Sequence, residues 1–199
     1  MTNKFKNMKN KILPILAGIV LTASCAQASE WESFINGDDV YIKFGGWSKH
    51  VTESFDKYEY NESHNGIGLE WTFFKSENKK HNLSLGYFHM KDSFDMDNKQ
   101  GGIIYTYKPD TGYYILDNIN YNLALMVMER GWIHRSKPYY NNYYFTTEVD
   151  PVALPYLTYN ITDYLNVDIM YIPQFDEAMP KSTFFIRGGF KLNKINDWL

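Results

Sequence analysis

The stretch Tyr121–Arg130, Y-N-L-A-L-M-V-M-E-R, carries the pattern on which the fold prediction rests. In an extended chain alternate residues share one face, which here carries Tyr121, Leu123, Leu125 and Val127. Asn122 and Ala124 fall on the opposite face. The same period of two recurs over residues 66–73, 83–92, 166–172 and 183–192, and no convincing helical period appears after residue 38. These segments predict β-strands.

Further segments near 39–50, 101–115 and 149–160 bring the predicted number of strands to eight. Short turn sequences follow the second, fourth and sixth strands. Longer links follow the odd-numbered strands, over residues 51–64, 93–100, 133–148 and 174–182. Eight strands of about ten residues with such links predict an all-β, eight-stranded antiparallel outer-membrane β-barrel. The alternative is a secreted barrel of the lipocalin type, whose apolar faces would point inward.

The composition combines many aromatic residues with a polar average. Aromatic residues make up 18% of the 199 residues, yet the mean hydropathy is −0.44. The aromatic content excludes a disordered chain, and the lack of a long apolar run outside the N-terminus excludes a helical membrane protein. A barrel that turns one face of each strand to lipid, with aromatic girdles at both membrane interfaces, explains both values.

The N-terminus predicts a secretory signal peptide over residues 1–28. Four lysines precede an apolar run over residues 12–23, and Ala26-Gln27-Ala28 supplies a cleavage site. A membrane anchor, or lipoprotein processing at Cys25, is the alternative. Cleavage removes four lysines and no acid, so the formal net charge falls from −3 to −7. Cys25 is the single cysteine, so the mature chain has none, which excludes disulfides and zinc–thiolate sites.

The remaining chain divides into a short N-terminal segment with a possible helix over 29–38, the barrel over 39–192 and a tail over 193–199. An acidic protein without a basic patch is not expected to bind nucleic acid. We expect a monomer in the bacterial outer membrane, with no metal and no cofactor.

The faces predicted to point inward change character along the barrel. Near the short turns they are small or polar, and toward the long links they are apolar, with a set that comprises Phe88, Met90, Met126, Met128, Met170 and Ile172. A water channel would not be lined in this way. The set suits either a flexible acyl chain, which unbranched methionine accommodates well, or a plugged structural core.

Several motifs resemble the lipid A palmitoyltransferase family of Gram-negative outer membranes. The most specific is Lys-Asp-Ser-Phe over residues 91–94, which resembles the segment holding that family's catalytic Asp and Ser. The others are Tyr-Asn-Glu at 60–62 before the glycine-bearing strand 66–69, Pro-Val-Ala-Leu-Pro at 151–155 and Met-Tyr-Ile-Pro at 170–173. Their order and spacing cover most of residues 40–192.

The resemblance implies transfer of a palmitoyl-like chain from a phospholipid donor to lipid A. It implies catalytic roles for Asp92 and Ser93, and places a histidine directly after a tryptophan at the end of the first strand. Here Ser48 follows Trp47, and the nearest histidine is His50. Ser48 and His50 share a strand face, and a bulge at Gly45-Gly46 would re-aim the side chain.

The resemblance also implies prolines beside lipid-access gaps, here Pro151, Pro155 and Pro173, because proline cannot donate to a strand ladder. His64 and His89 are further candidate histidines. A non-catalytic surface or lipid-binding barrel of the same superfamily is the main alternative function, and an acyl hydrolase acting on the same lipid is another.

Overall fold

The computed structural model describes residues 39–51, 60–135, 143–172 and 182–192, with side chains omitted for 132–145. The signal peptide, the segment 29–38, the tail 193–199 and Pro173 lie outside the described residues. Eight antiparallel strands form one closed barrel in which each strand pairs with the next and the last pairs with the first. The strands are β1 (Val40–His50), β2 (Ser63–Lys75), β3 (His81–Lys91), β4 (Asp97–Tyr107), β5 (Ile119–Arg135), β6 (Tyr143–Asn160), β7 (Leu165–Ile172) and β8 (Thr183–Lys191).

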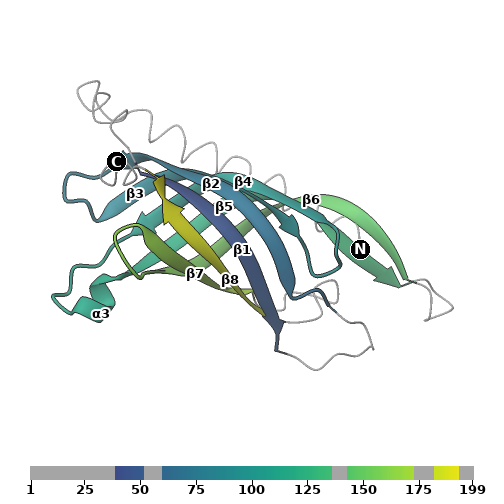
Figure 1. Cartoon of the computed structure of the whole chain (residues 1–199). Helices are drawn as coiled ribbons and strands as arrows, with labels where there is room; N and C mark the ends of the chain where they lie inside the picture. Colours follow the sequence, from purple (N-terminus) through teal and green to yellow (C-terminus); the bar gives the residue numbers. More distant parts are fainter. Residues whose placement is uncertain (1–38, 52–59, 136–142, 173–181, 193–199) are drawn as a thin grey trace, which may run out of the picture.

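The predicted fold is therefore confirmed, with corrections to the links. The β3–β4 link was expected over residues 93–100 but is a five-residue turn, 92–96. The fourth strand ends at Tyr107 instead of residue 115, and the short helix α3 (Tyr114–Asp117) follows it. β5 and β6 pair as far as Arg135 and Tyr143, where a link over 133–148 was expected. Figure 1 shows this hairpin projecting beyond the other strands.

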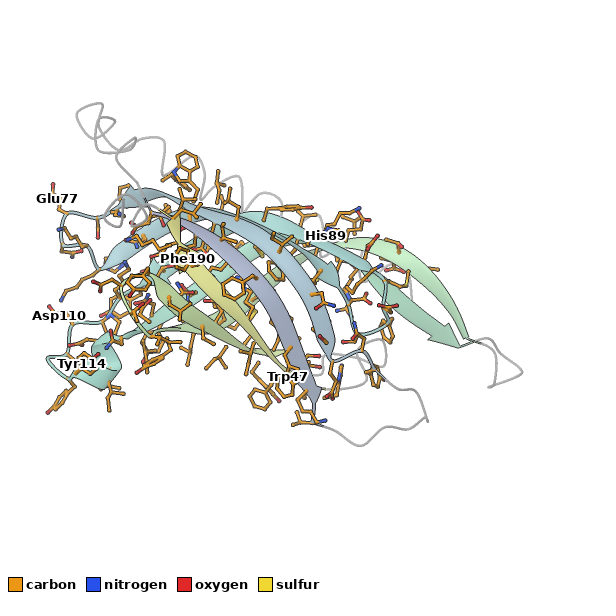
Figure 2. All side chains as sticks on the ribbon, viewed as in Figure 1. Trp47, Glu77, His89, Asp110, Tyr114 and Phe190 are labelled. Carbon is orange, nitrogen blue, oxygen red and sulfur yellow. The ribbon has the colours of Figure 1, made fainter. Side chains whose placement is uncertain are left out.

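The two ends of the barrel differ, and we name them by their connections. The turn end carries the links 76–80, 108–118 and 161–164, and the loop end carries the other four links. In Figure 2 the labelled Glu77, Asp110 and Tyr114 lie at the turn end, whereas Trp47 and His89 lie toward the loop end. By the usual rule for such barrels, short turns face the periplasm and longer loops face outward.

The outer face of the barrel is apolar. Large hydrophobic side chains remain exposed on every strand, among them Phe44, Trp47, Ile67, Leu69, Trp71, Leu85, Tyr87, Tyr105, Tyr107, Tyr121, Leu123, Val127, Leu157, Ile169, Tyr171 and Phe184. Aromatic pairs lie toward both ends, with Tyr107 and Tyr121 at 6.4 Å near the turns and Tyr171 and Phe184 at 5.1 Å near the loops. A lipocalin-type barrel would bury these side chains, so the protein is a membrane-spanning barrel of the outer-membrane type. Among the described residues, no helix is long and apolar enough to cross a bilayer.

The interior has the two zones that the strand faces predicted. Buried side chains toward the turn end are polar and include Thr72, Asn82, Ser84, Thr106, Asn122, Thr158 and Asn166. Toward the loop end a hydrophobic cluster follows, formed by Phe88, Ile104, Ala124, Met126, Tyr156, Met170 and Phe185. We call this cluster the apolar lumen. Alternation with period two explains the result, because one face of every strand must be buried.

Candidate functional site

Asp92 holds the tight turn that joins β3 to β4 at the loop end. One carboxylate oxygen accepts hydrogen bonds from the backbone N–H groups of Phe94 (2.8 Å) and Met96 (3.0 Å). The other accepts from the backbone N–H of Gly131 in β5 (2.9 Å). Asp95 takes the left-handed conformation, with φ at +60°, that closes the turn. Asp92 is 5% exposed, so its carboxylate joins this turn to β5 and fixes the position of Ser93.

The other candidate residues gather beside this turn. The backbone N–H of Asn61 donates to the Ser93 carbonyl (3.0 Å), and the Asn61 side chain donates to the Asp92 carbonyl (3.2 Å). The His50 ring stacks on Tyr60 at a centroid distance of 4.3 Å, and Tyr60 lies 5.8 Å from the ring of Phe94. His50, Asp92 and Ser93 therefore lie in one neighbourhood, which we call the loop-end site.

A buried serine–histidine pair lies in the same region. His64 Nε2 is 2.8 Å from Ser48 Oγ, and His64 Nδ1 is 2.6 Å from the carbonyl oxygen of Lys91, directly before Asp92. The two side chains are 1% and 2% exposed. The sequence suggested His50 as the main histidine, whereas the structure places His64 inside the barrel.

The predicted bulge at Gly45-Gly46 explains how Ser48 comes to face inward. The register of β1 shifts against both of its neighbours between Phe44 and Trp47, and both glycines have positive φ. The extra residue reverses the alternation, so Trp47 points outward and Ser48 inward. A methyl group at Gly46 would lie 3.1 Å from His64 Cβ and 3.2 Å from the ring of Phe185. The glycine therefore makes room for the histidine.

The apolar lumen, which contains several of the predicted acyl-chain residues, meets this pair at Phe185. Phe88, Met126, Met128 and Met170 are buried, Met90 and Ile172 are partly buried, and the His64 ring lies 5.5 Å from that of Phe185 in the apolar lumen. Phe88, Met126 and Met170 belong to the apolar lumen and Met90 packs against it, and Phe88 is only 1% exposed. An acyl chain in this position would have to displace some of them. Four of the six predicted residues are unbranched methionines, which allow this at low cost.

A group of paired charges lies between the apolar lumen and the polar zone. Asp168 accepts from Lys43 Nζ (3.0 Å), Arg187 Nε (2.8 Å) and Thr158 Oγ1 (2.7 Å). Glu70 lies 3.6 Å from Lys43, and the Arg187 guanidinium lies 4.8 Å from the centre of the Phe88 ring. The Asp168 side chain is 0% exposed and those of both cations are 4% exposed. We call Lys43, Glu70, Asp168 and Arg187 the ion cluster. It borders the apolar lumen on the side that faces the turn end.

The described β6–β7 ladder is short and stops beside two of the candidate prolines. Pairing of β6 with β7 runs from Asn160–Asn166 to Tyr156–Met170 and goes no further among the described residues. Pro155 directly precedes Tyr156 in β6, and Pro151 lies four positions before Pro155. Both prolines are exposed on the outer face. Proline has no N–H to donate to a strand ladder, and the lipid-access gap expected at these prolines stays a prediction.

Comparisons with known proteins give distant matches only. No protein-family model matches the chain, and no curated protein matches it. Among solved structures, the attachment invasion locus protein Ail of Yersinia pestis matches with a TM-score of 0.45 at 11% identity, over 77% of this chain and 95% of that one. Neisserial surface protein A matches with a TM-score of 0.41 at 12% identity, over 77% and 95%. A de novo designed transmembrane β-barrel matches with a TM-score of 0.40 at 12% identity, over 78% and 96%. All three matches are below 15% identity, and the resemblance to the palmitoyltransferase family stays a prediction from the motifs.

Proposed function

We propose that the protein is an outer-membrane acyltransferase that moves a fatty acyl chain from a phospholipid to lipid A. The observation that carries the proposal is the position of the polar loop-end site directly beside the apolar lumen. Acyl transfer needs a base for the attacking hydroxyl, donors that stabilise the oxyanion and a place for the chain. His64 is in contact with Phe185, so the polar and the apolar parts of this arrangement meet.

In this proposal the loop-end site supplies His50 as base, with Ser93 as a polar group near the reacting ester. Asp92 acts as a positioning residue, because its carboxylate is committed to the three backbone amides of its turn and of β5. The acyl chain would lie against Phe88, Met90, Met126, Met128, Met170 and Ile172. The end of the β6–β7 ladder beside Pro155 gives the donor phospholipid a lateral route from the membrane.

The test is mass spectrometry of lipid A from cells that express the wild type, His50→Ala, Ser93→Ala or Lys99→Gln. Lys99 is 46% exposed on its side chain and lies outside the site, so its variant serves as a control. We expect an additional acyl chain on lipid A with the wild type and the control, and a loss of about 100-fold or more with His50→Ala. An unchanged lipid A profile in cells whose wild-type protein is correctly inserted would refute the transferase.

A second candidate function is a non-catalytic barrel at the cell surface. It is favoured by the packing of the apolar lumen, in which Phe88 and Ile104 are each 1% exposed, above the ion cluster that ties β1 to β7 and β8. Heat-modifiable gel mobility tests insertion of the barrel independently of activity. A fully inserted wild type that leaves lipid A unchanged would favour this second function.

A further inference from the structure

The Ser48–His64 pair has one consistent arrangement of hydrogens. A carbonyl oxygen only accepts, so at 2.6 Å from the Lys91 carbonyl the Nδ1 atom of His64 must carry the proton. In the neutral ring Nε2 then has a free lone pair, and the Ser48 hydroxyl donates to it over 2.8 Å. A serine that donates to a histidine oriented by a third group has the arrangement of an activated nucleophile.

The surroundings distinguish Ser48 from the other serines inside the barrel. Ser84 is as deeply buried, at 1% exposure, but its hydroxyl is 3.0 Å from the Thr72 hydroxyl, which cannot act as a base. Among the described residues, no histidine or carboxylate lies within hydrogen-bond distance of the Ser93 hydroxyl. Ser48 pairs in register with Phe185 on β8, so its hydroxyl lies at the boundary of the apolar lumen.

We propose that Ser48 is the nucleophile of a covalent acyl-enzyme step, with His64 as its base. This inference rests on the proposed function, since it takes the acyl ester of a membrane lipid as substrate. It deepens that function by assigning the nucleophile to Ser48 and the proton transfers of both steps to His64, which takes the role of base given above to His50. The third member of the triad is the Lys91 carbonyl, which holds the imidazole in place.

The step balances without another reactant. Ser48 Oγ forms a bond to the carbonyl carbon of the lipid ester, and its proton moves to His64 Nε2. The bond from that carbon to the alcohol oxygen breaks, and His64 returns the proton to the departing alcohol. In the second step an acceptor hydroxyl attacks the Ser48 ester, gives its proton to His64 and takes the acyl chain, after which the proton returns to Ser48. At 1–2% exposure bulk water is kept from the pair, which favours a lipid hydroxyl as acceptor over hydrolysis.

The experiment uses the full protein folded in phospholipid vesicles and a long-chain alkyl fluorophosphonate. This probe transfers its phosphonyl group to an activated serine with loss of fluoride. We expect one adduct, located by peptide mass spectrometry at Ser48, and labelling about 100-fold slower or more in His64→Gln. The glutamine amide can still donate to the Lys91 carbonyl, so this variant removes the base and keeps that hydrogen bond. Ser84→Ala is the matched control and is expected to label as the wild type does.

Two readouts separate this inference from the proposed function. Labelling at Ser48, with loss of acylated lipid A in Ser48→Ala, supports both. Labelling at Ser48 in a wild type that leaves lipid A unchanged supports the nucleophile and refutes the transferase. A wild type that acylates lipid A but is labelled at Ser93, is not labelled, or stays active as Ser48→Ala refutes the nucleophile alone. Failure of both readouts in correctly inserted protein overturns both.

Discussion

Replacing Asp168 by asparagine tests whether the ion cluster holds the barrel interior together. The Asp168 carboxylate satisfies two cations, with 3.0 Å to Lys43 Nζ and 2.8 Å to Arg187 Nε. Its side chain is 0% exposed, so water cannot replace the lost charge. Among the described residues, Lys43 would keep Glu70 at 3.6 Å and the neutral Asn166 side-chain oxygen at 3.3 Å, and Arg187 would lose its carboxylate. Removing one member of a buried ion group typically costs about 3–5 kcal/mol, and we expect the free energy of unfolding to fall by that amount.

The measurement is urea unfolding of the protein in phospholipid vesicles, followed by tryptophan fluorescence. Glu129→Gln provides the matched control, because Glu129 and Lys99 form a 3.5 Å pair whose side chains are 38% and 46% exposed. An exposed pair of this kind contributes about 1 kcal/mol or less. The two substitutions remove the same charge, so a difference between them reports burial.

A double variant gives the sharper result. In Asp168→Asn the buried Lys43 ammonium no longer has the Asp168 carboxylate beside it. Adding Lys43→Met removes that buried positive charge. We expect the double variant to be more stable than the sum of the two single effects predicts, with a coupling energy of about 0.5–3 kcal/mol. An Asp168→Asn protein within about 1 kcal/mol of the wild type, or fully additive effects, would refute the reasoning.

Two further predictions concern the bulge and the turn end. Gly46→Ala adds a methyl group 3.1 Å from His64 Cβ at a φ of +119°, and we expect it to lower the free energy of unfolding by about 1–3 kcal/mol. The measurement is the loss of heat-modifiable gel mobility with increasing urea. Gly45→Ala, whose methyl group meets nothing within 4 Å, should cost less, and equal effects would contradict the contact. Hydrogen bonding from the backbone N–H of Thr111 lowers the pKa of Asp117 below its usual 3.8, so its support of the α3 loop is complete above that pH and is lost as the pH falls through the lower value. Carboxyl NMR titration measures this pKa, and a value at or above 3.8 would contradict the prediction.

The strand faces could be predicted from the sequence because alternation has a period of two. The predicted inward positions Ser84, Phe88, Met126, Asp168 and Met170 are all buried. A slip of one residue would have turned each of them to lipid, so the hydrophobic pattern specifies the register strongly. The β3–β4 link was wrong because the Asp92 carboxylate closes a five-residue turn through the backbone N–H groups of Phe94 and Met96, so that β4 already begins at Asp97.

The loop-end site could be predicted only in part. The Lys-Asp-Ser-Phe motif indicated the turn, and the Gly45-Gly46 pair indicated the bulge. The partnership of Ser48 with His64 depends on counting the bulge as one extra residue, which makes Ser48 an inward position in β1. The ion cluster joins residues more than 100 positions apart, such as Lys43 and Asp168, and the relative heights of distant strands follow from closure of the whole barrel.

The long β5–β6 hairpin has a consequence for local stability. Beyond Glu129, which pairs with Lys99, β5 has no partner in β4, and beyond Tyr156 β6 has no partner in β7. Beyond Gly131, which donates to Asp92, the described residues 132–135 and 143–146 at the tip pair only with each other. A two-stranded ribbon of this kind is marginally stable by itself in water. Its backbone amides should exchange hydrogen for deuterium well before those of the closed barrel, so the molecule opens from this tip while the rest stays folded.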